Sequence, residues 1–300
     1  EIRDMKHSGA SSLEALEVLH CKQRRRRRLH LFLQIVVFAF LFLLTMTPIV
    51  WGVITSFKAE REVVAYPPKL WGFTPVLSNY TELFVSGYMR TFLNSVLYAL
   101  SSIVLGLFLG MMAAYGLQRH RFPGRKFLFY LVIAGIPLSA GSAVLLIPNY
   151  MYFSLLGLTN RMLSLTILYA AYNLPMAIWI MRGGLENIPI EIEEAASIDG
   201  CSRAYILFNL IPSLNRPAMA SAAIFIFIGA WNEFIVASVM INSTELRPVQ
   251  LAIYHYMGFF GTNWGPLTAA ATFAIIPVLI VFSILGKFLV SGLMQGSVKG

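Results

Sequence analysis

The chain has 300 residues, of which 57% are hydrophobic and only 12% are charged, and its formal net charge is +9. This composition is far too apolar for a soluble domain. The positive charge needs no nucleic-acid partner, because basic residues beside membrane spans explain it.

Six apolar runs are each about long enough to cross a bilayer, which takes about 20 helical residues. The runs are continuous and do not alternate between apolar and polar residues, so helices are favoured over strands. The predicted fold class is all-α, a polytopic membrane protein with six transmembrane helices. The expected spans are Leu29–Phe57, Thr91–Leu117, Phe127–Phe153, Ser164–Met181, Ala218–Ile241 and Pro266–Val290.

Most of the 23 Lys and Arg residues lie in the N-terminal tail, the second and fourth connections, and the C-terminal end. Such residues concentrate on the cytoplasmic side of membrane spans. We therefore expect both termini and these two connections in the cytoplasm. Cys21 and Cys201 then lie where thiols stay reduced, and their neighbours offer no metal-ligand spacing.

The N-terminal tail covers residues 1–28. Ser11 and Glu14 form a capping-box pattern followed by leucines at helical spacing, which predicts a short amphipathic helix along the inner membrane surface. A disordered tail is the alternative. The arginines from Arg24 to Arg28 resemble the start of a signal peptide, but the apolar run is too long and lacks a cleavage site. It is therefore interpreted as a retained first span.

The first outer segment, Lys58 to Arg90, is rich in Pro, Gly and aromatic residues, which predicts an ordered excursion at the outer interface. A second aromatic-rich outer stretch runs from His255 to Trp264. Packing alone would explain these aromatic residues, as would contact with a partner. Prolines at positions 137, 148 and 175 indicate spans that bend, either around a pathway or for packing.

Glu233 is the only carboxylate inside any expected span. Because charge inside a bilayer is costly, it should face a polar cavity or a partner group. Direct contact with a solute and a structural polar pairing both remain open. Tyr172 and Asn173 in the fourth span are weaker candidates for the same cavity.

The connection 182–217 holds five of the 14 acidic residues of the chain. Pro189 suits the first turn of a helix, Asn187 is the expected N-cap, and Gly200 is the expected stop. Ala195 and Ala196 leave a shallow surface that another backbone could approach. The pattern favours a short helix that sits in a groove of a partner, and an ordinary loop helix is the alternative.

The run Glu194-Ala195-Ala196, followed by Asp199-Gly200, Pro212 and Pro217, resembles the "EAA" loop of ABC-importer permeases, most closely the maltose-type branch that imports carbohydrates. Gly200 to Pro212 is one residue shorter than is usual there. The resemblance implies that this loop docks on a cytoplasmic ATPase subunit. The ATPase-coupling residues that it implies are Glu191, Glu194, Ala195, Ala196, Asp199, Gly200 and Pro212.

Three further motifs resemble motifs of that family: the turn Arg121-Phe122-Pro123-Gly124-Arg125, the run Trp231-Asn232-Glu233-Phe234, and the glycine-rich end 291–300. The second motif implies a place at the interface between two permease subunits. Trp231, Asn232 and Glu233 are our candidates for the substrate pathway, with Tyr172 and Asn173 as weaker ones. The third implies that Gln295 and Gly296 reach into the ATPase dimer. The outer segments would then meet a solute-binding protein.

No GxxxxGK[ST], HExxH, GxSxG or CxxC motif occurs, so the chain has no P-loop for ATP. We assign no catalytic or metal-binding residue and no cofactor to it. The resemblance implies that ATP and Mg are bound by a separate ATPase.

The resulting hypothesis is a permease subunit, not an enzyme, for a di- or oligosaccharide in the bacterial cytoplasmic membrane. Its domains are the tail (1–28), a six-span permease domain (29–290) and a C-terminal tail (291–300). The implied partners are a second permease in a heterodimer, an ABC ATPase dimer, a solute-binding protein and membrane lipids. The alternatives are an ion-coupled secondary transporter that uses Glu233 and a membrane scaffold that transports nothing.

Overall fold

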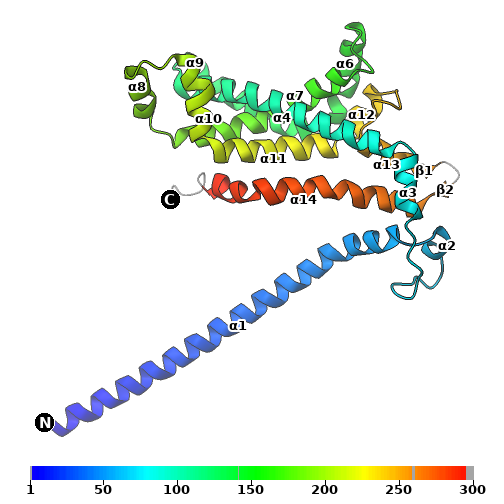
Figure 1. The fold of residues 1–300 in the computed structure, drawn as a ribbon. Helices are drawn as coiled ribbons and strands as arrows, with labels where there is room; N and C mark the ends of the chain where they lie inside the picture. Colours follow the sequence, from blue (N-terminus) through cyan, green and yellow to red (C-terminus); the bar gives the residue numbers. More distant parts are fainter. Residues whose placement is uncertain (1, 141, 259–260, 295–300) are drawn as a thin grey trace. The chain divides into compact units, whose positions relative to one another are not determined.

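The computed structural model describes residues 2–140, 142–258 and 261–294, and almost all of its regular structure is helical (Figure 1). Within that part of the chain the strands are β1 (Met257–Gly258) and β2 (Gly261–Thr262), an antiparallel pair in which Met257 lies opposite Thr262. The all-α fold class is therefore confirmed. The chain divides into two compact units, residues 1–54 and residues 55–300.

The first unit is formed by α1 (Ile2–Ser56), a single helix that contains both the tail and the first expected span. The prediction of a separate short helix in the tail is wrong. No Gly or Pro occurs between Ala10 and Thr47 to interrupt a helix, so the tail continues directly into the apolar run. Apolar side chains from Leu31 to Leu44 are exposed along it, as in a helix that faces lipid.

The second unit is built around α4 (Tyr88–Arg119), α7 (Met162–Glu186), α11 (Arg216–Asn232) and α14 (Trp264–Met294). α4 packs along both α7 and α11, and α11 packs along α14 (Figure 1). Small residues allow the close approach: Gly110 lies against Met181 and Gly106 against Ile226.

In the described residues, helices long and apolar enough to cross a membrane occur in α1, α4, α7 and α14. A fifth span results if the segment Arg203–Leu214 is counted together with α11, to which it is bent by 83°. Several of the described helices are therefore long and apolar enough to span a membrane, and the count of six remains a prediction.

Two of the expected spans are divided. The third consists of α5 (Arg125–Ala140) and α6 (Ser142–Leu155), on either side of residue 141. The fifth consists of α11 and α12 (Ile235–Met240), which are separated by Glu233 and Phe234. The fourth is longer than expected, because α7 continues past Met181 to Glu186 and buries Leu185.

The first outer segment is ordered, as predicted, and contains α2 (Glu60–Val63) and α3 (Ser78–Val85). The buried Asn79 amide donates to the carbonyls of Ser56 and Lys58 at 2.8 and 2.9 Å. The second outer stretch follows α13 (Val249–His255). The aromatic side chains of Tyr66 and Trp71 remain exposed, so packing does not account for all of the aromatic residues in the first segment.

Candidate functional site

The acidic connection between α7 and α11 carries α8 (Ile190–Ile198). Pro189 precedes the first turn of α8, and Glu191 and Glu193 within that turn complement the helix dipole. Asn187 is not the N-cap: it ends α7, and its amide donates to the Gly183 carbonyl at 3.1 Å. The predicted cap is wrong because α7 extends five residues further than its apolar run.

Gly200 ends α8 with a left-handed backbone, at φ +86°. Its N–H donates to the Ser197 carbonyl at 3.2 Å, and the Cys201 N–H donates to the Ala196 carbonyl at 2.9 Å. These two bonds form a Schellman motif, which satisfies carbonyls that a helix end leaves free. A Cβ on Gly200 would meet nothing within 4 Å. Within this chain, glycine is therefore required by the backbone angle and not by crowding.

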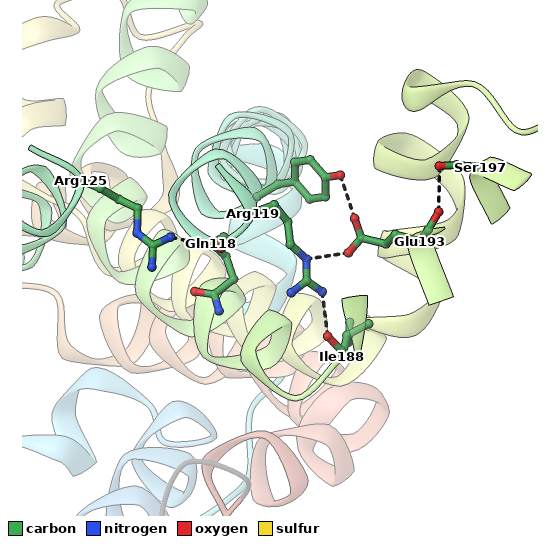
Figure 2. Close-up of polar contacts among 7 residues, drawn as sticks. Gln118, Arg119, Arg125, Ile188, Glu193 and Ser197 are labelled. Atoms are coloured by element: carbon green, nitrogen blue, oxygen red, sulfur yellow. Dashed lines mark hydrogen bonds and ion pairs between the residues drawn. The ribbon is translucent and has the colours of Figure 1, made fainter. Parts of the chain in front are cut away.

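One side of α8 is held against the end of α4 by a buried ion pair (Figure 2). The Arg119 Nε lies 2.6 Å from a carboxylate oxygen of Glu193, and the Tyr115 hydroxyl donates to the other oxygen at 2.8 Å. A second nitrogen of Arg119 donates to the Ile188 carbonyl at 2.8 Å. The Arg119 and Glu193 side chains are only 11% and 9% exposed.

Tyr115, Arg119 and Glu193 were not among the predicted site residues. Tyr115 and Arg119 are four residues apart on α4 and therefore share a face, which is the signal that the sequence contains. Their partner Glu193 is 74 residues away from Arg119, so the pairing itself was not accessible from spacing. Removal of only one partner of a buried pair of this kind destabilises the folded protein by about 3–5 kcal/mol.

The base of the acidic connection is closely packed. The buried Asn215 amide donates to the Met181 carbonyl at 3.1 Å, which links the start of α11 to α7. A Cβ on Gly184 would overlap the Asn215 amide oxygen and the Ala218 side chain. The two ends of the connection are thus fixed against each other, and α8 is presented on a supported loop.

The other side of α8 is free within this chain. Glu191, Glu194, Ala195 and Asp199 are exposed, and Ala196 is half-buried. Ile198 is 85% exposed, which leaves an isoleucine side chain among carboxylates with no packing partner in the described residues. An amphipathic helix with this pattern matches the helix-in-groove form of recognition.

Six of the seven predicted coupling residues therefore lie on α8 or at its end. The seventh, Pro212, is half-buried in α10 (Ile211–Leu214), which follows α9 (Arg203–Tyr205) and a π-helical turn at Ile206–Leu210. Pro212 therefore lies outside α8 along the chain, beyond α9 and the π-helical turn. Gln295 and Gly296 lie outside the described residues.

The second group of predicted residues surrounds the break between α11 and α12. The Glu233 carboxylate accepts hydrogen bonds from the backbone N–H groups of Val236 (2.9 Å) and Ala237 (3.1 Å), so it caps α12. The buried Tyr169 hydroxyl and the half-buried Tyr172 lie close enough to interact with its charge. Sequence reasoning did not identify this capping role.

The remaining members of that group differ in exposure. Trp231 is buried and stacks on Phe227, with ring centroids 5.4 Å apart, whereas Asn232 is exposed. The Asn173 amide donates to the Tyr169 carbonyl at 2.7 Å and lies against Gly229. The Tyr172 hydroxyl accepts from Asn149 at 2.6 Å. Tyr172 and Glu233 are near each other, but Trp231 and Asn173 are committed to helix packing.

The chain thus presents a supported acidic helix, α8, between two of its long apolar helices, α7 and α11. The family of binding-protein-dependent transport system inner membrane components matches residues 106–295. This match includes α8 and the whole acidic connection, and the chain belongs to that family.

Among similar proteins, the sulfoquinovosyl glycerol transport system permease protein SmoH of Agrobacterium fabrum is 34% identical over 256 residues, which cover 84% of this chain and 88% of that protein. The diacetylchitobiose uptake system permease protein NgcG of Streptomyces coelicolor is 30% identical over 262 residues, 85% of each chain. One solved chain belongs to a bacterial ABC transporter involved in the import of the acidic polysaccharide alginate. The match covers 87% of this chain and 96% of the solved chain, with a TM-score of 0.73 and 22% identity. The two chains therefore have the same fold.

Proposed function

We propose that this chain is one of two different permease subunits in an ATP-driven importer for a di- or oligosaccharide. The observation that carries the proposal is the free face of α8, in which the exposed Ile198 lies among the carboxylates of Glu191, Glu194 and Asp199. The substrate class rests on the similarity to permeases named for diacetylchitobiose and sulfoquinovosyl glycerol.

In this proposal α8 docks into a groove on a cytoplasmic ATPase subunit. Ile198 supplies the apolar contact, and burial of one isoleucine contributes about 1.5–3 kcal/mol. The carboxylates select a groove with basic residues, because like charges across an interface are unfavourable. ATP and Mg are bound by the ATPase dimer, and this chain itself is not an enzyme and carries no cofactor.

Movement of α8 passes to the membrane helices through Arg119. Because Glu193 and the Ile188 carbonyl both bind Arg119, a displacement of α8 is applied directly to the end of α4. α4 packs along α7 and α11, so these three helices move as one body. Closure of the ATPase dimer would then change the access of the pathway by rigid-body rotation.

In this proposal both termini and α8 lie in the cytoplasm, which the distribution of basic residues supports, and the outer segments face a solute-binding protein. Exposed Tyr66 and Trp71 are suited to that contact, since aromatic residues are enriched at interfaces. The pathway lies along the partner permease, with Glu233, Tyr172 and Asn232 as its polar candidates in this chain.

The test is reconstitution of the complete importer in liposomes, with the second permease, the ATPase and the solute-binding protein. Uptake of a labelled di- or oligosaccharide is measured with ATP inside and again with a non-hydrolysable analogue. The proposal expects uptake that requires ATP hydrolysis and the binding protein and is unchanged by proton and sodium ionophores. Uptake that collapses with the ionophores and persists without ATP would favour the ion-coupled alternative.

A further inference from the structure

A cluster of basic side chains surrounds two hollows near the start of α5, on the side of the molecule that carries α8. The smaller hollow, about 160 Å³, is lined by residues of α4, α5 and α7. The larger, about 420 Å³, is lined by the turn between α4 and α5 and by the first residues of α5. Arg125 and Lys126 line both of them. Arg182 lines the smaller hollow and Arg121 the larger.

The cluster has an excess of positive charge. Arg182 is paired with Glu186 at 3.1 Å and is held by Gln118, and its guanidinium lies 3.7 Å from the centre of the Phe129 ring. Among the residues that the structure describes, no carboxylate lies within ion-pair distance of Arg121, Arg125 or Lys126. The cluster therefore contains four cationic side chains and one carboxylate, which are those of Arg121, Arg125, Lys126, Arg182 and Glu186.

Arg125 is positioned but not neutralised. Its guanidinium makes long contacts of 3.5 and 3.4 Å with the carbonyls of Gln118 and His120, and Figure 2 shows it beside Gln118. Since α5 begins at Arg125, the N-terminal end of its dipole also favours an anion here.

An exposed apolar surface adjoins the basic cluster. Phe127, Tyr130 and Leu131 are 73%, 66% and 57% exposed and are spaced as one face of the first two turns of α5. Phe122 in the turn is also exposed. The positive charge is thus at the end of the helix, and the apolar face runs from it along the helix.

We propose that this cluster binds the phosphate headgroup of an anionic phospholipid, with the acyl chains along the exposed face of α5. A basic pocket between membrane helices is the form of site that anionic headgroups occupy. A free phosphate ion would leave the adjoining apolar face without a function, so the lipid is the ligand that fits both features. The site is distinct from α8 and does not depend on the identity of the transported solute.

The test uses the full chain, purified with its partner permease, stripped of lipid and titrated with phosphatidylglycerol. Bound lipid is counted by native mass spectrometry, and phosphatidylcholine and inorganic phosphate are titrated in parallel. The charge-removing variant is R125Q/K126Q. The matched control is R61Q/R90Q, which removes two exposed cations from the outer segment, and R125K/K126R keeps the charge at the site.

We expect the unmodified protein to bind at least one phosphatidylglycerol more tightly than phosphatidylcholine. R125Q/K126Q should bind phosphatidylglycerol with an affinity about tenfold lower than the unmodified protein does. R61Q/R90Q and R125K/K126R should bind as the unmodified protein does. Added salt should weaken binding, because part of the site is exposed. Equal affinity for the lipid in R125Q/K126Q and the control, or inorganic phosphate that displaces the lipid at comparable concentration, would overturn the proposal.

Discussion

Arg119 and Glu193, 74 residues apart in the sequence, form a buried ion pair of 2.6 Å that joins the end of α4 to the first turn of α8. The same guanidinium binds the Ile188 carbonyl just before α8. α8 is therefore held by its inner side and its preceding turn, while its outer side stays free for another protein.

The first prediction concerns this pair. R119M or E193L alone should lower the free energy of unfolding by about 3–5 kcal/mol, because each leaves one buried charge without its partner. The double variant R119M/E193L should recover most of that loss, since a buried pair is often replaced by apolar side chains at little net cost. Thermal unfolding of the purified permease measures all three.

The exposed pair Arg90–Glu245, 3.2 Å apart with side chains 59% and 66% exposed, is the control. Its removal by E245L should change stability by no more than about 1 kcal/mol. Simple additivity of R119M and E193L would show that the two residues do not interact.

The second prediction uses two neighbouring glycines of α7. G184A should lower the melting temperature, because its Cβ would overlap Asn215 and Ala218, and overpacking costs about 1–3 kcal/mol. G183A should be neutral or stabilising by about 0.5–1 kcal/mol, because a Cβ there meets nothing within 4 Å. A melting temperature for G184A as high as that of G183A would refute the close packing at the base of the connection.

The third prediction separates two reasons for a glycine at position 200. Asn tolerates a left-handed backbone, whereas a β-branched side chain does not, and the difference costs about 1–2 kcal/mol. If the backbone angle alone requires Gly200, G200N should retain transport and G200V should lose most of it. Equal loss in both variants would mean that a partner approaches this residue too closely for any Cβ.

The fourth prediction concerns Glu233. E233A removes the acceptor for the Val236 and Ala237 amides, so it should destabilise the protein by about 1 kcal/mol. E233Q keeps an acceptor oxygen and should keep the melting temperature. Loss of transport in E233Q at unchanged stability would assign the charge to the pathway, whereas an unchanged melting temperature in E233A would contradict the capping role.

Local features of the site could be read from the sequence. The stop at Gly200 was predictable because few residues adopt positive φ, and the helix before it followed from Pro189 and the acidic first turn. The cap at Asn187 was mispredicted because the extension of α7 depends on burial of Leu185 against distant residues. The hydropathy pattern indicates only that the apolar run ends at Met181.

Contacts between distant segments could not be predicted. Glu193 and Glu194 are neighbours of the same residue type, and Glu193 is the buried one because Arg119 and Tyr115 of α4 bind its carboxylate. The break between α11 and α12 is a second example. No Gly or Pro occurs at residues 232–234, so the local sequence does not indicate that α11 ends there and that Glu233 caps α12.

The most direct test of the central claim, that the free face of α8 binds the ATPase, is co-purification. The tagged permease carries I198A or E194K and is isolated in detergent, and the second permease and the ATPase are both quantified. Loss of the Ile198 contact should reduce ATPase recovery about tenfold. E194K should reduce it by at least as much, because it introduces repulsion. The partner permease should be recovered in full, as it should with I35A, which alters an isoleucine of α1 that is 65% exposed. Full recovery of the ATPase with both α8 variants, together with normal transport, would contradict the account.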